Sequence, residues 1–134
     1  MNQPAELPQI DVIAHDTPVA WGAQVFNSAD GKTCVIAGQI RGASLGKVDA
    51  GGVFHKYPNR SNGSCGTLTN KQGGFISYAF GVDRTAIYGR VRAGASSVTL
   101  VVDGERKPVS VGPEGAFLAI YKGRVFASDW TVDG

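Results

Sequence analysis

Short runs in which apolar and polar residues alternate recur along the chain, and they predict β-strands. In residues 19–26 (VAWGAQVF), Val19, Trp21, Ala23 and Val25 share one face at the two-residue period of a strand. No long segment keeps the period of a helix, and glycine interrupts the best one, residues 42–50. The expected strands are residues 10–14, 19–26, 32–40, 53–57, 67–70, 73–82, 86–92, 96–102, 106–111, 116–121 and 124–130.

Turn residues separate these runs and mark hairpins. Asp30-Gly31 and Asp103-Gly104 each lie between two strand-like runs, which is a strong signal for a hairpin. Pro108 has no N–H to donate to a ladder, so we expect it at a sheet edge or a bulge. The closely spaced turns predict that the second half of the chain runs as a meander.

Composition supports an all-β fold in one domain. Glycine and proline fill 25 of the 134 positions, 19 and 6 respectively, where average usage gives about 16. The chain is 43% hydrophobic and long enough for one real core. We expect a linker or a non-native extension at residues 1–9. Residues 10–134 are expected to form a single antiparallel β-sandwich, Ig-like or related, with about eight to ten short strands and one disulfide.

The charge pattern excludes several classes of protein. The formal net charge is +2, from 13 basic and 11 acidic residues, with no basic stripe. Nucleic-acid binding is therefore not expected. The glycine-rich segments lack the ending of a phosphate-binding loop. With only two histidines and two cysteines in the chain, neither a metal nor another cofactor is expected.

The sequence offers residues for two kinds of covalent crosslink. Cys34 and Cys65 flank strand-like sequence and are not a C-x-x-C pair, so we expect them to form one disulfide. The alternative is two buried free thiols in a cytosolic protein. An isopeptide bond would require Lys32 or Lys47 to contact Asp129, and nothing local in the sequence supports it.

The expected location is secreted or extracytoplasmic. The disulfide suits an oxidising compartment. The first residues, MNQPAELPQ, have neither the basic nor the apolar region of a signal peptide. We expect that a signal peptide or a membrane anchor was removed ahead of Met1.

No catalytic constellation is visible, so we expect a protein that is not an enzyme. His15 and Asp16 are adjacent, and adjacent strand residues point to opposite faces. Ser64, next to Cys65, lies in a loop without the G-x-S-x-G pattern of a nucleophile elbow. His55 could act as a ligand or a base, or it could be a half-exposed strand histidine.

Aromatic and polar loop residues form the candidate binding set. Exposed tryptophan and tyrosine rings could stack on sugars or peptides, while buried ones would fill the core. Segments 41–52 and 58–66 are irregular enough to serve as contact regions, and Asn62 begins a glycosylation sequon. The candidate ligand-binding residues are Trp21, His55, Tyr57, Arg60, Asn62 and Trp130.

Several motifs together carry a resemblance to a known kind of domain. They are GKTCVIAGQI, LGKV, GGVF and SNGSCG, followed by YGRVRAGASSVTLVVDGERKPVSVGPEGAFLAIYKG. This arrangement resembles extracytoplasmic β-domains of unassigned function in surface or membrane-anchored proteins of high-GC Gram-positive bacteria. The resemblance implies a cell-surface location and an antiparallel fold, and it carries no catalytic residues.

The function expected from the sequence is a non-enzymatic extracytoplasmic binding or sensing module of a cell-surface or membrane-anchored protein. Its partner would be a protein or a cell-envelope polymer, recognised through loops or a sheet edge. A membrane anchor would lie outside this chain. One alternative is a carbohydrate-binding module that uses exposed aromatic residues. A second alternative is a small secreted hydrolase built on dispersed residues.

Overall fold

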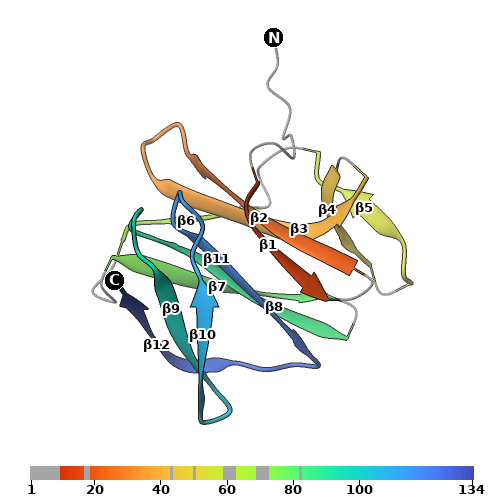
Figure 1. The fold of residues 1–134 in the computed structure, drawn as a ribbon. Coiled ribbons are helices and arrows are strands. Elements are labelled where there is room, and N and C mark those ends of the chain that lie inside the picture. The colour runs from red at the N-terminus through yellow and green to blue at the C-terminus, as the bar shows by residue number, and fades with distance from the viewer. Residues whose placement is uncertain are drawn as a thin grey trace.

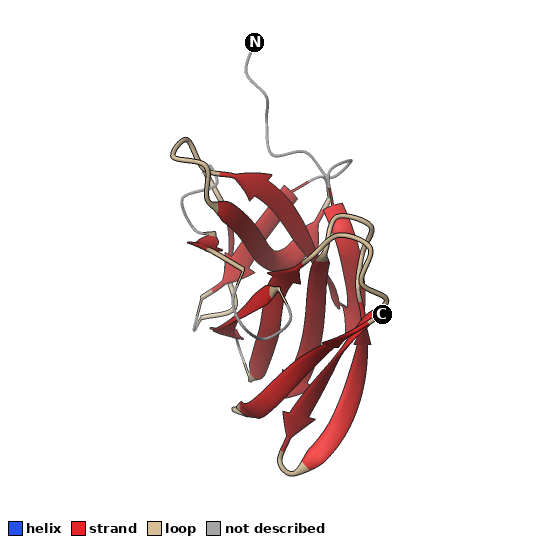
Figure 2. Ribbon diagram, turned by 90° about the vertical axis from the view of Figure 1, so that its left-hand side faces the viewer, coloured by secondary structure: helices blue, strands red, loops and turns tan. Residues whose placement is uncertain are grey.

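A computed structural model describes residues 10–16, 19–42, 44–49, 51–58, 63–68, 73–81 and 83–134. Twelve strands and no helix lie in these residues, and all strand pairs are antiparallel (Figure 2). The all-β class, the antiparallel pairing and the disulfide are therefore confirmed. The strands form three sheets.

The first sheet contains the N-terminal strands in the order β1-β2-β3-β4-β5, and β6 also pairs with β3. Its strands are β1 (Ile10–Asp16), β2 (Val19–Asn27), β3 (Thr33–Arg41), β4 (Ser44–Val48), β5 (Phe54–Lys56) and β6 (Ser64–Gly66).

The C-terminal half of the chain builds two sheets of three strands each. The middle sheet has the order β11-β8-β7, and the last sheet has the order β10-β9-β12. Their strands are β7 (Gly74–Gly81), β8 (Arg84–Val91), β9 (Ser97–Val102), β10 (Glu105–Ser110), β11 (Ala116–Lys122) and β12 (Ala127–Asp133).

The middle sheet packs between the other two (Figure 1). Alternate side chains of β8 enter different cores: Ile87 packs in a cluster with the last sheet, whereas Ala86 and Tyr88 pack in a cluster with the first. The same alternation holds in β11, where Phe117 faces the last sheet and Leu118 the first. The sandwich therefore has three layers and two hydrophobic cores.

The expected meander in the second half is wrong. The β9–β10 hairpin closes at Asp103-Gly104 as predicted, and β10 is an edge strand, as Pro108 indicated. The chain then crosses between sheets from β8 to β9, from β10 to β11 and from β11 to β12. Closely spaced turns are compatible with both arrangements, because a turn does not specify which strand its neighbour will pair with.

Strand bounds also differ from the expectation at three places. The last strand is residues 127–133 instead of 124–130. A short strand lies at residues 64–66, before the expected strand at 67–70, of which residues 69 and 70 lie outside the described residues. The segment of residues 41–52, which was expected to be irregular, contains β4. A Cβ on Gly38 would lie 2.3 Å from the carbonyl oxygen of Gly46, so β3 and β4 approach where neither residue has a side chain. Glycine thus permits a strand that an apolar–polar pattern does not reveal.

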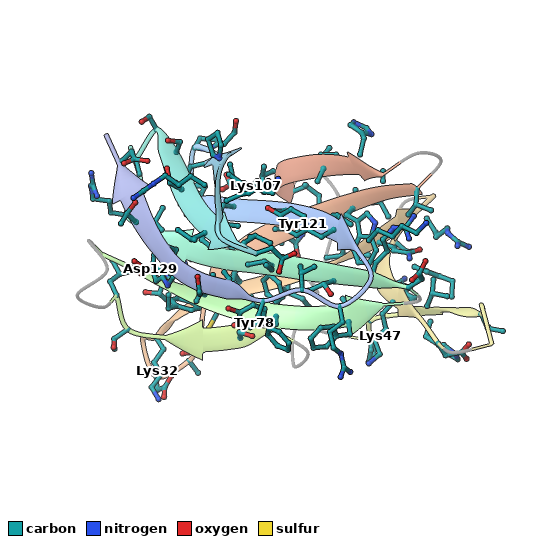
Figure 3. All side chains as sticks on the ribbon, turned by 90° about the horizontal axis from the view of Figure 1, so that it is seen from below. Lys32, Lys47, Tyr78, Lys107, Tyr121 and Asp129 are labelled. Carbon is teal, nitrogen blue, oxygen red and sulfur yellow. A yellow bond between two sulfur atoms is a disulfide. The ribbon has the colours of Figure 1, made fainter. Side chains whose placement is uncertain are left out.

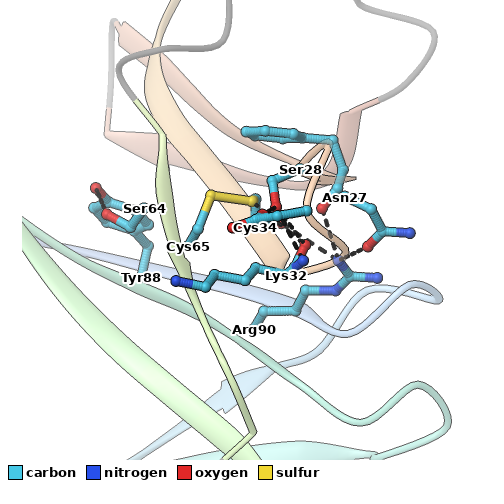
Figure 4. Close-up of a disulfide and its surroundings, with 10 residues drawn as sticks. Asn27, Ser28, Lys32, Cys34, Ser64, Cys65, Tyr88 and Arg90 are labelled. Atoms are coloured by element: carbon cyan, nitrogen blue, oxygen red, sulfur yellow. Dashed lines mark hydrogen bonds between the residues drawn. A yellow bond between two sulfur atoms is a disulfide. The ribbon is translucent and has the colours of Figure 1, made fainter.

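The disulfide and an arginine fix the first sheet (Figure 4). Cys34 is fully buried and lies opposite Cys65 in the β3–β6 pair. Arg90 of the middle sheet donates from Nη1 to the carbonyl oxygen of Phe26 at 3.1 Å and to that of Cys34 at 3.4 Å. The disulfide indicates an oxidising, extracytoplasmic environment. Within the described residues, no helix is long and apolar enough to cross a membrane.

Candidate binding groove

An open groove lies where the three sheets each present an edge strand. β1 ends the first sheet, β11 the middle sheet and β10 the last sheet. The groove has a volume of about 560 Å³, which is in the range of ligand-binding clefts. Its lining residues are Val12, Ile13, Arg106, Lys107, Pro108, Val109, Ser110, Leu118, Ala119 and Tyr121.

The groove opens because β10 and β11 separate beyond the turn that joins them. At the turn, the N–H of Gly112 donates to the carbonyl of Ala116 at 2.8 Å, and Val111 forms an isolated bridge with Phe117. Farther from the turn, β10 pairs with β9 and β11 pairs with β8. The two strands thus belong to different layers, and the space between them forms one side of the groove.

Asp11 fixes the other wall of the groove to the same turn. Its carboxylate accepts hydrogen bonds from the backbone N–H of Glu114 and of Ala116, each at 2.8 Å. The backbones also touch, since a Cβ on Gly112 would lie 2.3 Å from the carbonyl oxygen of Asp11. β1 is therefore tied to β11 at this end without a ladder between them.

The outer edge of β11, next to the groove, carries backbone groups that face away from β8. The N–H and the C=O of Ala116 both bond on the side away from β8. Alternate residues of a strand direct their backbone groups to the same side, so the N–H and C=O of Ile120 also face away from β8. Among the described residues, no strand pairs with β11 at Ile120 on that side. This edge has the donors and acceptors that a further strand needs.

The facing edge of β10 lacks a donor at Pro108. The two-residue turn makes Glu105 and Val102 the first hydrogen-bonded pair of the β9–β10 hairpin. Counting along the ladder, Pro108 falls at a position whose backbone nitrogen faces away from β9. Proline has no N–H, and edge strands commonly use it to discourage pairing. β11 is therefore the edge of the groove that can accept a strand.

The groove lining is cationic. It contains Arg106 and Lys107 and no carboxylate, although the Nζ of Lys107 lies 3.1 Å from Oε1 of the neighbouring Glu105. Figure 3 shows Lys107 and Tyr121 near each other. Burial raises the pKa of Tyr121, and the charge of Lys107 opposes that rise. The lining thus offers two positive charges and a neutral hydroxyl.

The two tryptophans predicted as candidate stacking residues are core residues. Trp21 is 5% exposed and Trp130 is 7% exposed. Trp21 packs between the first and middle sheets, and Trp130 packs between the middle and last sheets. Their rings do not reach the surface, which corrects their inclusion among the binding candidates and fits the alternative that they fill the core.

Tyr57 and His55 are not among the residues that line the groove. Tyr57 is partly buried and donates its hydroxyl to the carbonyl of Ala37 at 2.8 Å, and burial raises its pKa to about 12. His55 is exposed on β5. Arg60 and Asn62 lie outside the described residues.

His55 makes a hydrogen bond to a carboxylate. Its Nε2 lies 2.7 Å from Oδ2 of Asp49, and Oδ1 of Asp49 accepts hydrogen bonds from the N–H groups of Gly51 and Val53. The bond from Val53, then that from His55, lowers the pKa of Asp49. The hydroxyl of Ser64 lies instead 3.3 Å from the Tyr88 hydroxyl. The structure therefore joins His55 to an acid but not to this serine.

The remaining candidate chemistry is also dispersed. His15 is exposed on β1, and the side chain of Asp16 is outside the described part. No three metal-ligating side chains cluster in the described part of the chain. Lys32 and Lys47 belong to the first layer, whereas Asp129 lies on β12 in the last layer, so the structure does not bring them together for an isopeptide bond (Figure 3).

Comparisons with protein-family models, with curated proteins and with solved structures find no match to this chain. The sequence pattern does not reveal the residues of the groove, because β1 is remote in the chain from β10 and β11, and β10 and β11 belong to different sheets. Pro108 was the one signal for an edge, and it did not indicate which other edges lie beside it.

Proposed function

We propose that the protein is a non-enzymatic extracytoplasmic binding module that holds an extended segment of a partner protein in the groove. The observation that carries this proposal is the outer edge of β11 at Ile120, which has no neighbouring strand in the described residues and borders a cationic groove. The disulfide supports the extracytoplasmic location.

Binding would occur by strand addition. A partner segment in extended conformation would pair with the backbone groups of Ile120 on β11, and main-chain hydrogen bonds would supply affinity. Its alternate side chains would point into the groove. Arg106 and Lys107 favour a segment that carries carboxylates, since charge complementarity raises the association rate and helps fix the register.

The carbohydrate-binding alternative has less support. Both tryptophans are buried, and the large exposed aromatic residues in the described part are Phe80 and Phe126. The Phe126 ring is inclined at 59° to Tyr78 and at 68° to Phe80. Rings at these angles do not present one flat face on which a sugar ring could lie, so a protein partner is the better proposal.

Selection from a random peptide library on the immobilised domain tests the proposal. We expect enriched peptides with alternating β-branched residues and carboxylates. Ile13→Lys and Arg106→Glu should weaken their binding at least about tenfold, which corresponds to about 1.4 kcal/mol. Val53→Lys, at an exposed apolar residue outside the groove, is the matched control. The proposal fails if no peptide is enriched, or if binding ignores the groove variants.

A further inference from the structure

A second surface, separate from the groove, lies where two turns meet at one end of the sandwich. The N–H of Gly123, after β11, donates to the carbonyl of Asp83, before β8, at 3.0 Å. The fully buried Thr85 donates its hydroxyl to the Gly123 carbonyl at 2.6 Å and accepts from the Val125 N–H at 3.1 Å. These bonds fix the two turns to each other.

Two phenylalanines are exposed on this end although they contact each other. Phe126 is 56% exposed and Phe80 is 45% exposed. The Phe126 ring centroid lies 5.9 Å from that of Phe80 and 5.6 Å from that of Tyr78. The Tyr78 hydroxyl donates to the Ala127 carbonyl at 3.0 Å. We call Tyr78, Phe80 and Phe126, with the two turns beside them, the aromatic end.

Positive charge surrounds the exposed rings. The guanidinium carbon of Arg124 lies 4.7 Å from the centre of the Phe80 ring, and Lys122 is also exposed. Arg84 donates to Asp83, the one carboxylate of these two turns. Three cations and one carboxylate leave the aromatic end with a net positive charge.

A hollow between the turns places guanidinium groups beside an apolar ring. It has a volume of about 260 Å³, and its lining residues are Phe80, Asp83, Arg84, Gly123 and Arg124. Guanidinium groups bind phosphate through paired N–H donors. The hollow is half the size of the groove, and it suits a headgroup better than an extended chain.

We propose that the aromatic end docks the domain onto the surface of an anionic phospholipid bilayer. Phe80 and Phe126 would enter the boundary between headgroups and acyl chains, where exposed apolar side chains are removed from water. Arg84 and Arg124 would bind headgroup phosphates, and Lys122 would add attraction to the negative surface. The rings and the cations would act together, because neither signal alone gives stable attachment. This docking is independent of the groove and of its proposed partner.

Sedimentation with lipid vesicles tests the proposal on the whole chain. We expect binding to vesicles of equal parts phosphatidylglycerol and phosphatidylcholine, and little binding to phosphatidylcholine alone. Lys122→Gln should reduce the partition coefficient about fivefold. Phe80→Ser combined with Phe126→Ser should abolish binding. Lys47→Gln combined with Val53→Ser removes one cation and one exposed apolar side chain from the first-sheet region, away from the aromatic end, and should leave binding unchanged.

A tryptophan reporter gives a second measurement that does not depend on the amount bound. In Phe126→Trp, the added indole should shift its emission to shorter wavelength with anionic vesicles and become shielded from iodide. Inorganic phosphate should not displace the protein from vesicles. The proposal is overturned if no shift occurs, if the control variant loses binding equally, or if free phosphate competes. Enrichment of peptides that need Phe80 and Phe126 would also overturn it, since the aromatic end would then be a protein-binding surface.

Discussion

The carboxylate of Asp11 accepts a hydrogen bond from the backbone N–H of Ala116 at 2.8 Å, across 105 positions of the chain. This bond joins the edge of the first sheet to the edge of the middle sheet at one end of the groove. With the second bond, from the N–H of Glu114, it replaces the ladder that β1 and β11 do not form. The shape of the groove therefore depends on one acidic side chain.

Replacing Asp11 with alanine should destabilise the domain. Two backbone N–H groups would lose a charged acceptor, and a hydrogen bond to a charged group contributes about 1.5–3 kcal/mol. We expect the free energy of unfolding to fall by about 2 kcal/mol in a denaturant titration. Glu105→Ala removes an exposed carboxylate on β10, which lines another side of the groove, and should change stability by less than about 0.5 kcal/mol. Equal effects of the two variants would show that Asp11 does not hold the strands.

Removing the disulfide should cost more than removing Asp11. Cys34 and Cys65 are 31 positions apart, and on the chain-entropy model closing a loop of that length stabilises the fold by about 3–4 kcal/mol. The double variant Cys34→Ala, Cys65→Ala should lose stability of that order.

Intact mass after thiol blocking checks the bond itself: the native protein should take up no blocking group until it is reduced. Two blocked thiols in the folded, unreduced protein would contradict the disulfide and the compartment inferred from it.

The pKa of Asp49 predicts an effect of acid on the hairpin of β4 and β5. Because its folded-state pKa lies below the usual value of 3.8, the stability it contributes is present above the unfolded-state pKa. That contribution is lost as pH falls through the folded-state value. A carboxyl-carbon NMR titration of Asp49 should therefore have its midpoint below 3.8.

Substitution of His55 separates the two causes of that shift. The N–H of Val53 is the larger cause and His55 the second, so His55→Ala should raise the Asp49 midpoint only partway towards its usual value. Lys47→Ala changes the residue opposite His55 on β4 and is the control. A full return to the usual value in His55→Ala would show that the histidine, and not the hairpin backbone, holds the charge.

Pro108 should protect the outer edge of β10 against pairing with other molecules. Pro108→Thr supplies an outward N–H at the position where β10 now has none, so we expect greater self-association. Sedimentation velocity measures it. Ser110→Thr introduces the same side chain two residues along the same edge but adds no donor, and it should remain like the parent protein. A Pro108→Thr variant that also behaves like the parent would contradict the proposed role of the proline.

Local features of the fold could be predicted from the sequence. The Asp103-Gly104 turn, the edge position of Pro108 and the pairing of Cys34 with Cys65 are all confirmed. The first two depend on chemistry within a residue or two, an Asp-Gly turn and a missing N–H. Propensity and spacing carry that information directly. The disulfide could be predicted because the chain has only two cysteines.

The assembly of the sheets and the groove could not be predicted in this way. Leu118 and Phe117 are both apolar, and only the two different layers explain why adjacent residues are both buried. The groove depends on the contact of Asp11 with a turn more than 100 positions away. Contacts of this range are set by how the layers pack, and no local pattern records them.

Amide hydrogen exchange at Ile120 tests the central claim, that β11 offers a free edge to a partner strand, most directly. We expect this N–H to exchange quickly in the free domain and slowly when a selected peptide is bound. The N–H of Ala119, which faces β8, should be protected in both states. Strong protection of Ile120 in the free domain, or no change on binding, would contradict strand addition at this edge.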